Sequence, residues 1–315
     1  MPAAVMQLLD DTCDVDLHDG TALSEDELIS RLQGKQGVMS VFTDQMTRPV
    51  IEAATSLRVI ANVAVGYNNV DLDAARERGV IVTNTPDVLT ETTANLTWAL
   101  ILDCTRRVSE GDRLIRRGRW TGWTFDFMLG NDLAGKQLGI VGMGRIGQAV
   151  ARRATAFDMN VAYFSPRTRI PVQSGENREN YTRCNFMALD RLLATSDVVT
   201  LHCPLTPDTR HLINQTALAR MKRSAYLINV ARGPVVDEAA LAWALKNRMI
   251  AGAALDVYEG EPEVHQDLLA LENVVLSPHL GSSTKDARVA MADLAARNVI
   301  AVLSGNSPLT PVPGA

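Results

Sequence analysis

The sequence predicts an α/β protein with two doubly wound parallel sheets, and two observations carry that prediction. Short apolar runs rich in β-branched residues alternate with helical segments along most of the chain, which is the order of repeated strand–helix–strand units. One run, LGIVGMGRIG from Leu138 to Gly147, leads through a glycine turn into the helical stretch AVARRATAF. Open parallel sheets of this kind bind ligands outside the carboxyl ends of their strands.

The strands and helices fall into two series. The first has strands expected at Gly37–Phe42, Arg58–Val63 and Val80–Thr83, with a helix over Asp71–Arg78. The second is longer, with helices such as Gln215–Met221 and Glu238–Asn247 between strands expected at Gln137–Val141, Asn160–Phe164, Val198–Leu201, Ala225–Asn229, Ala251–Leu255 and Val274–Leu276.

Two further helical segments define the domain organisation. Thr92–Arg117 joins the two series, and Thr284–Leu303 closes the chain. The second domain is therefore expected to be an insertion into the first: residues 1–97 plus 285–315 form one domain, and residues 98–284 form the other. The polar stretch Ser165–Arg183 is expected to be a surface loop.

The glycine turn is typical of a pyrophosphate cradle in a Rossmann dinucleotide-binding unit. Gly142 permits the tight turn, Gly144 lets the backbone approach the phosphates, and Gly147 lets the helix pack on the strand. The helix amino terminus, where Arg145 and Ile146 lie, offers N–H groups to an anion. A glycine turn in some other α/β fold is the alternative, because G-x-G-x-x-G alone is common by chance.

The residues at the end of the next strand, in NVAYFSPRTR, indicate which dinucleotide the domain binds. Enzymes that select NAD usually place Asp or Glu there to bind the ribose hydroxyl. This chain offers Ser165, Arg167 and Arg169 instead. Guanidinium groups pair with a phosphate in a fork geometry, so NADP is favoured and NAD stays possible. Solvated loop arginines are the alternative.

Composition excludes several classes of protein. The net charge is −5 and aromatic residues make up 5% of the chain, so a nucleic-acid partner is not expected. The four cysteines include no C-x-x-C pair, which argues against disulfide or zinc frameworks and fits a reducing cytoplasm. No metal site is expected. No basic leader opens the chain, and no apolar stretch approaches the roughly 20 residues that span a bilayer.

Three fragments that follow expected strands concentrate chemistry: INVARGPVVDE around Arg232, ALDVYEGEP around Glu261 and VLSPHLGSST around His279. Reduction of a ketone leaves an alkoxide that needs a proton, and His279 can donate it near neutral pH. Glu261 would favour the imidazolium. Arg232 would hold a substrate carboxylate and polarise the carbonyl. Each residue taken singly has an alternative: Arg232 could form a surface ion pair, Glu261 could be a solvated loop residue, and His279 could cap the following helix.

Because these motifs occur in the order typical of one family, the chain resembles the D-isomer-specific 2-hydroxyacid dehydrogenases. Within that family it is most similar to the glyoxylate/hydroxypyruvate reductase branch. The resemblance runs from about Leu57 to the carboxyl terminus through ANVAVGYNNVD, GMGRIG, HCPLTPDT, NVARG, DVYEGEP and PHLGSST. It implies a Rossmann domain inserted into a flavodoxin-like substrate domain. It also implies that Arg232 binds substrate, Glu261 supports the histidine and His279 is the acid/base.

Further roles follow from the same resemblance. The backbone of Ala64, Val65 and Gly66 would bind the substrate carboxylate as a nest. The implied contacts with the cofactor are Thr93, Cys203, Pro204, Val230, Asp256 and Gly281. The segment Thr121–Gly130 resembles the dimer arm of this branch, with Trp120 and Trp123 as candidates to reach the partner of a homodimer, or to pack at an ordinary interface.

The chain departs from the family pattern at its start. Family members open with a strand of the type K-V-x-V-T, whereas PAAVMQLLDDTCDVDLHD already resembles the first helix and the second strand. The first strand of the substrate domain is therefore expected to be missing, which would expose strand edges or leave a gap. A start codon placed too late, or a shortened chain, would explain it.

The favoured function is reduction of a small 2-oxo acid, glyoxylate or hydroxypyruvate, with NADPH to a D-2-hydroxy acid. Other members of the family act on 3-phosphoglycerate or phosphite, and these alternatives keep the same three residues. Formate oxidation does not need the Glu–His pair. A coenzyme-sensing corepressor on the same scaffold is an alternative of another class, for which no residue of an exposed peptide groove is found.

Overall fold

A computed structural model describes residues 1–18, 20, 23–166 and 184–314. The chain divides into two compact units. The split unit consists of Met1–Leu89 with Ser282–Ala315, and the central unit consists of Thr90–Gly281. The central unit is thus inserted into the split unit. Its first helix, α5 (Thr90–Arg106), lies wholly within it, whereas the boundary expected between residues 97 and 98 falls inside that helix.

The central unit contains a seven-stranded parallel sheet in the order β10-β9-β8-β7-β4-β5-β6. Its strands are β4 (Gln137–Val141), β5 (Asn160–Phe164), β6 (Cys184–Phe186), β7 (Val198–Leu201), β8 (Tyr226–Asn229), β9 (Gly252–Leu255) and β10 (Val274–Leu276). Strand order reverses at β4, which has β5 on one side and β7 on the other. Such a reversal point is where open α/β sheets bind ligands.

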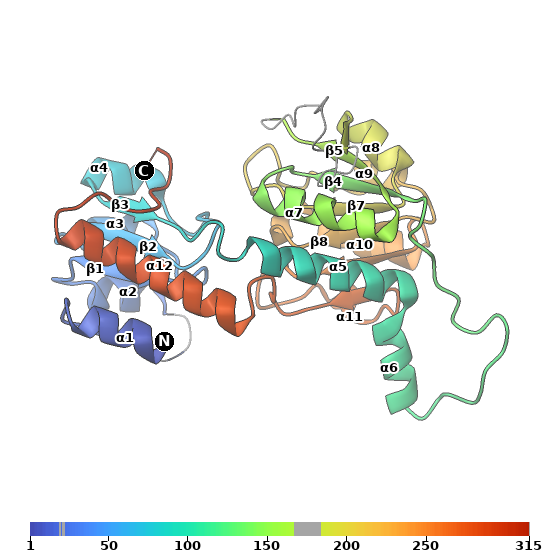
Figure 1. Cartoon of the computed structure of the whole chain (residues 1–315), viewed down its shortest axis with the longest axis horizontal. Helices are drawn as coiled ribbons and strands as arrows, with labels where there is room; N and C mark the ends of the chain where they lie inside the picture. Colours follow the sequence, from blue (N-terminus) through green and yellow to red (C-terminus); the bar gives the residue numbers. More distant parts are fainter. Residues whose placement is uncertain (19, 21–22, 167–183, 315) are drawn as a thin grey trace. The chain divides into compact units, whose positions relative to one another are not determined.

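Helices cover both faces of this sheet (Figure 1). One face packs on α5 and α7 (Arg145–Ala154), which is followed by the 3-10 turn η1 (Thr155–Phe157). The other face packs on α8 (Leu189–Thr195), α9 (Gln215–Arg220) and α10 (Glu238–Lys246), and the unit also contains the turn η2 (Gly233–Val235) and α11 (Gln266–Leu269). Strand residues alternate between the two cores, which explains why these strands are apolar throughout.

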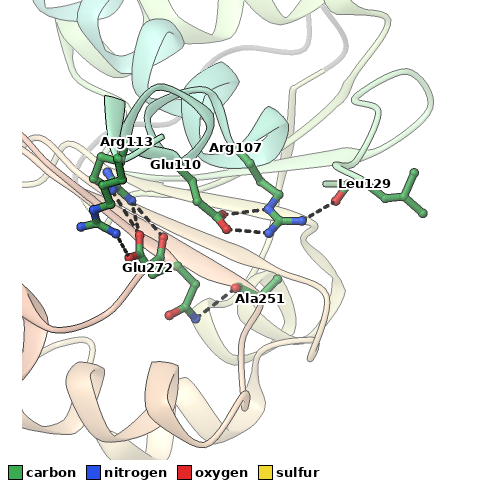
Figure 2. A network of polar contacts seen from close by, with 8 residues as sticks. Arg107, Glu110, Arg113, Leu129, Ala251 and Glu272 are labelled. Atoms are coloured by element: carbon green, nitrogen blue, oxygen red, sulfur yellow. Dashed lines mark hydrogen bonds and ion pairs between the residues drawn. The ribbon is translucent and has the colours of Figure 1, made fainter. Parts of the chain in front are cut away.

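The segment Thr92–Arg117, expected to be largely helical, is helical but consists of two helices instead of one. Arg107 adopts a left-handed conformation, with φ 57°, and divides α5 from α6 (Val108–Arg116). Figure 2 shows the Arg107 guanidinium directed at Glu110, to which it donates hydrogen bonds of 2.8 and 2.6 Å. Arg113 donates to Glu272 just before β10, at 3.1 Å. These ion pairs fix the direction in which α6 leaves the unit.

A cavity of about 340 Å³ lies beside this network. Its walls include Cys104 of α5 and the first residues of β8 and β9, Tyr226 and Gly252. It therefore lies at the amino ends of the strands, the edge opposite to the one at which α/β sheets bind their ligands.

The split unit contains a three-stranded parallel sheet in the order β1-β2-β3. Its strands are β1 (Gly37–Ser40), β2 (Val59–Asn62) and β3 (Ile81–Thr83). One face packs on α2 (Glu25–Arg31), α3 (Arg48–Ala53) and α4 (Leu72–Arg78), and the other on α12 (Lys285–Leu303), against which α1 (Ala3–Asp10) lies. In the part of the chain that the structure describes, no helix is long and apolar enough to cross a membrane.

The prediction that a strand follows the first helix near the start of the chain is wrong. Residues 13–18 follow α1 without forming a strand. Asp16 in this segment instead pairs with Arg31 and Lys35, at 2.5 and 3.4 Å. The alternation of polar and apolar residues there therefore reflects ion pairing by Asp16 and packing of Val15 against α1 and α12, rather than pairing in a sheet.

Trp98 of α5 joins α7 and η1 to the sheet, and it gives a stability prediction. Its ring stacks on Phe157 at 4.3 Å between centroids, and its Nε1 donates to the Val150 carbonyl at 3.1 Å. Trp98→Ala is expected to lower the free energy of unfolding by about 3–5 kcal/mol in denaturant titrations, because a buried aromatic ring is lost. The control Trp243→Ala, at a half-exposed position of α10, should change it by less than about 1 kcal/mol. Equal effects would contradict this packing.

Candidate active site

The glycine turn joins β4 to α7 at the reversal point of the sheet. Gly142 has φ 97°, and a Cβ there would lie 2.5 Å from the backbone nitrogen of Cys203. A Cβ on Gly147 would lie 2.2 Å from the carbonyl oxygen of Gly142. Gly144 differs from both, because nothing lies within 4 Å of a Cβ built on it. Glycine is thus needed at 142 and 147 for packing, while Gly144 faces open space at the start of α7, where Arg145 and Ile146 lie.

The loop after β7 crosses behind this turn and carries His202, Cys203 and Pro204. Burial lowers the pKa of His202 to about 3 and raises the pKa of the Cys203 thiol to about 11, so both side chains are neutral near pH 7. His202 Nε2 lies 2.9 Å from Thr200 Oγ1, and its Nδ1 has no hydrogen-bond partner among the described residues. Nothing in the sequence pattern singles out His202, although it lies in the motif HCPLTPDT.

The other expected cofactor contacts lie at the same edge of the sheet or on α5. Ser165 is buried directly after β5, and the preceding carbonyl, of Phe164, accepts a hydrogen bond from Gly142 N–H at 2.8 Å. Val230 is buried directly after β8. Thr93 of α5 donates from its hydroxyl to the Gly281 carbonyl at 3.0 Å. Arg167 and Arg169 lie outside the described residues.

Asp256, directly after β9, holds the loop that carries His279. Its Oδ1 accepts hydrogen bonds from the Ser277 hydroxyl at 2.6 Å and Leu280 N–H at 2.7 Å, and its Oδ2 accepts one from Gly281 N–H at 2.8 Å. Burial raises the pKa of Asp256, and these hydrogen bonds oppose that effect. The loop needs this support because His279 has φ 54°, a conformation that favours glycine. The family resemblance implies only a cofactor contact for Asp256, and this supporting role is visible only in the structure.

Glu261 and His279 form a hydrogen-bonded pair. Nδ1 of His279 lies 2.7 Å from Oε2 of Glu261, and each side chain is about one quarter exposed. Oε1 of Glu261 accepts a hydrogen bond from Tyr258 N–H at 3.0 Å. Burial raises the pKa of Glu261, but the hydrogen bonds from His279 and Tyr258 and the nearby charge of Arg232 outweigh burial and lower it. An ionised carboxylate on Nδ1 favours the imidazolium and fixes the orientation of the ring.

Arg232 lies on the loop after β8, next to the strand that leads to Glu261. The fully buried Asn229 shapes this loop: its Oδ1 accepts a hydrogen bond from Ala231 N–H at 3.1 Å, and its Nδ2 donates to the Arg232 carbonyl at 3.0 Å. Burial lowers the pKa of Arg232, and the charge of Glu261 opposes that effect. The guanidinium stays protonated. The structure thus brings all three residues to the carboxyl ends of β8, β9 and β10.

In the split unit, the loop Ala64–Gly66 follows β2 with its carbonyl groups turned toward the protein. Each carbonyl accepts one hydrogen bond: Ala64 from Thr85 N–H at 2.9 Å, Val65 from Asn84 Nδ2 at 2.8 Å, and Gly66 from Asn62 Nδ2 at 2.8 Å. Within the described ranges, no acceptor is found for the N–H groups of Val65 and Gly66. These two successive N–H groups are therefore available to an anion.

The comparison with known families agrees with this geometry. Residues 98–281, more than half of the chain, match the family model of the D-isomer specific 2-hydroxyacid dehydrogenase, NAD binding domain. The chain belongs to the D-isomer-specific 2-hydroxyacid dehydrogenase family. As a dehydrogenase of this family, it carries a domain for a nicotinamide dinucleotide and acts on a small-molecule substrate.

Relatives cover nearly the whole of this dehydrogenase. It is 44% identical to a glyoxylate reductase of Thermofilum pendens over 98% of this chain and 91% of the relative. A crystal structure of the TT0316 protein from Thermus thermophilus has a TM-score of 0.91 and 45% identity, and covers 99% of this chain and 97% of that one. A structure of the NADPH-dependent glyoxylate/hydroxypyruvate reductase of Sinorhizobium meliloti, in complex with NADP and malonate, has a TM-score of 0.87 and 34% identity. The match covers 100% of this chain and 94% of that one.

The glycine turn gives a test of the dinucleotide site. Gly144→Ala should leave the melting temperature of the apo dehydrogenase unchanged or slightly higher, because the added Cβ meets nothing in the protein. It should raise the Kd for NADPH or NADH about 10-fold or more, because the added methyl keeps the backbone from the pyrophosphate. Gly147→Ala, by contrast, should lower the melting temperature as well. Wild-type coenzyme affinity in Gly144→Ala would show that the cradle is elsewhere.

Proposed function

We propose that this dehydrogenase reduces small 2-oxo acids to D-2-hydroxy acids, with glyoxylate and hydroxypyruvate as favoured substrates. The observation that carries the proposal is the Glu261–His279 hydrogen bond of 2.7 Å beside Arg232, at the edge of the sheet that also carries the glycine turn. The name of the Thermofilum pendens relative supports glyoxylate, and the name of the Sinorhizobium meliloti relative supports hydroxypyruvate as well.

The three residues supply what a carbonyl reduction needs besides hydride. The bound nicotinamide coenzyme supplies the hydride. Arg232 binds the substrate carboxylate with its planar guanidinium and polarises the adjacent carbonyl. The imidazolium of His279 donates a proton to the oxygen on which negative charge develops. Glu261 keeps the ring charged before the transfer and oriented during it.

The split unit contributes a second anion site in this proposal. The N–H groups of Val65 and Gly66 bind the substrate carboxylate, whereas the Ala64 N–H already donates to the Asn62 carbonyl at 2.8 Å. Three side-chain and backbone donors hold the loop by its carbonyl groups, so the N–H groups are ordered before substrate arrives. Binding by backbone dipoles avoids burying another charged side chain.

We propose NADPH as the preferred coenzyme, with NADH as a weaker alternative. The end of β5 carries Ser165 where an NAD enzyme places a carboxylate, so nothing at that position repels a 2′-phosphate. Arg167 and Arg169 would pair with that phosphate. The Sinorhizobium meliloti relative, described as NADPH-dependent, supports this choice. Thr93, Cys203, Pro204, Val230, Asp256 and Gly281 would line the remaining cofactor surface.

We also propose that the enzyme is a homodimer joined through the arm, residues Thr121–Gly130. Phe125 is 88% exposed and Trp123 76% exposed, and Trp120 and Leu129 are more than half exposed. Apolar side chains gathered on one exposed segment mark a protein interface. Aromatic anchors are typical of such interfaces. The ion pairs of Arg107 and Arg113 hold α6, from which the arm extends.

Turnover tests the proposed chemistry. Initial rates with glyoxylate and hydroxypyruvate should give a higher kcat/KM with NADPH than with NADH. His279→Ala should lower kcat about 10²–10⁴-fold because the proton donor is lost, while the Kd for NADPH changes less than about 2-fold. The control His18→Ala, at an exposed position of the split unit, should behave as wild type. Wild-type turnover by His279→Ala would refute the assignment, and coenzyme binding without turnover by the wild type would favour a coenzyme sensor.

The oligomeric state tests the arm. Light scattering coupled to size exclusion should give twice the monomer mass for the wild type. Phe125→Asp should weaken the dimer about 100-fold or more, because a charge replaces an aromatic anchor at the interface. Leu309→Asp, at an exposed apolar position of the split unit, is the matched control and should stay dimeric. A monomeric wild type, or a fully dimeric Phe125→Asp, would contradict this interface.

A further inference from the structure

A second carboxylate–imidazole pair lies two residues before Glu261, and the proposed reaction does not use it. Oε1 of Glu259 accepts hydrogen bonds from Nε2 of His211 and from Nη2 of Arg210, both at 2.8 Å. These two donors belong to the turn after β7, whereas Glu259 belongs to the loop after β9. The pair therefore joins two loops at the carboxyl edge of the sheet.

The backbone of Glu259 is fixed from another side. Its N–H donates to Oε1 of Glu238 at 2.7 Å. Glu238 is the first residue of α10 and is only 5% exposed, so its carboxylate cannot easily move to follow a displaced loop. Burial raises the pKa of Glu238, and the hydrogen bond from Glu259 N–H opposes that effect.

The same peptide also contacts the loop that carries Arg232. A Cβ on Gly233 would lie 1.9 Å from the carbonyl oxygen of Tyr258 and 2.4 Å from the nitrogen of Glu259. The backbone after Arg232 thus packs directly on the Tyr258–Glu259 peptide. Tyr258 N–H in turn donates to Oε1 of Glu261 at 3.0 Å. A shift of this peptide would displace Glu261 relative to both of its functional neighbours.

We infer that Glu259 is a positioning residue: held by Arg210 and His211, it fixes the Tyr258–Glu261 turn so that Glu261 meets His279. The kinetic part of this inference rests on the proposed function. A partly exposed ion pair usually adds little stability, so the expected effect is on the geometry of the Glu261–His279 pair. The charged and titratable groups placed around the turn are Arg210, Arg232, His211, His265, His279, Glu238 and Asp256.

The test measures the pH midpoint at which the His279 imidazole titrates, by NMR on protein labelled at histidine, without substrate. Glu261 favours the charged ring, so a displaced Glu261 must move the midpoint to lower pH. Glu261→Gln sets the full effect, because it removes the charge that faces Nδ1. Glu259→Ala should move the midpoint in the same direction by roughly a third to a half of that, and Arg210→Ala by less. Proton donation needs the charged ring, so the kcat/KM profile should lose activity at correspondingly lower pH.

Two variants separate positioning from other causes. Glu259→Gln removes the charge but keeps an oxygen that accepts from Arg210 and His211, so it should titrate as wild type. The double variant Glu259→Ala/Glu261→Gln should titrate as Glu261→Gln alone, because Glu259 acts only through Glu261. In Glu259→Ala, kcat/KM should fall about 3- to 10-fold, with the Kd for NADPH and the melting temperature near wild type.

The outcomes that overturn the inference are distinct from a failure of the proposed function. A wild-type midpoint in Glu259→Ala would overturn it. An equal shift in Glu259→Gln would assign the effect to long-range charge, and an added shift in the double variant would show that Glu261 is not the link. Because the titration needs no turnover, a protein that reduces no 2-oxo acid yet shows the expected shifts would refute the proposed function and leave the positioning role standing.

Discussion

The contact between the Glu261 carboxylate and the His279 imidazole depends on the parallel order of three neighbouring strands. Arg232, Glu261 and His279 are far apart in sequence, and each follows a different strand among β8, β9 and β10. Parallel strands direct all their carboxyl ends to one edge, so the loops that leave them meet there. The apolar cores on the two faces hold the strands in register, and the chemistry is confined to the loops.

Buried polar residues at the ends of strands convert this arrangement into a fixed site. Asn62 ends β2, Asn229 ends β8 and Asp256 follows β9, and each is almost fully buried. Asn62 and Asn229 bond to the backbone of the loop that follows their own strand, and Asp256 bonds to the backbone of the loop after β10. Buried polar groups that are fully satisfied make a local structure specific. The same device thus orders the anion-binding loop of the split unit and the loops of Arg232 and His279 in the central unit.

The sequence predicts most accurately the buried strands of the central unit, whose apolar pattern has a single cause, burial on both faces. β4, β5, β7 and β10 have the predicted bounds, because a strand covered on both faces is a continuous apolar run that ends at glycine or polar residues. The three strand-end motifs could be found because parallel topology alone brings such ends together. The parallel sheets of both units confirm the predicted fold class.

Other features depend on contacts that no local pattern records. The break at Arg107 depends on pairing with Glu110 and on the place of Glu272, far along the chain. The alternation in residues 13–18 resembles a strand, yet Asp16 pairs with Arg31 and Val15 packs on α1 and α12 instead. His279 has a left-handed backbone conformation, which the loop held by Asp256 supports. A sequence does not reveal such a conformation at a histidine, because it is uncommon for residues other than glycine. The roles of the site residues stay predictions.

A crystal structure of the enzyme with NADPH and oxamate, an inert analogue of a 2-oxo acid, would show directly whether His279, Glu261 and Arg232 meet at the substrate. We expect His279 Nε2 to lie within hydrogen-bond distance of the oxygen that represents the reacting carbonyl, with Nδ1 still on Glu261 and the Arg232 guanidinium on the carboxylate. A ligand bound with its carbonyl oxygen turned away from His279, or with Arg232 in contact with neither group, would contradict it.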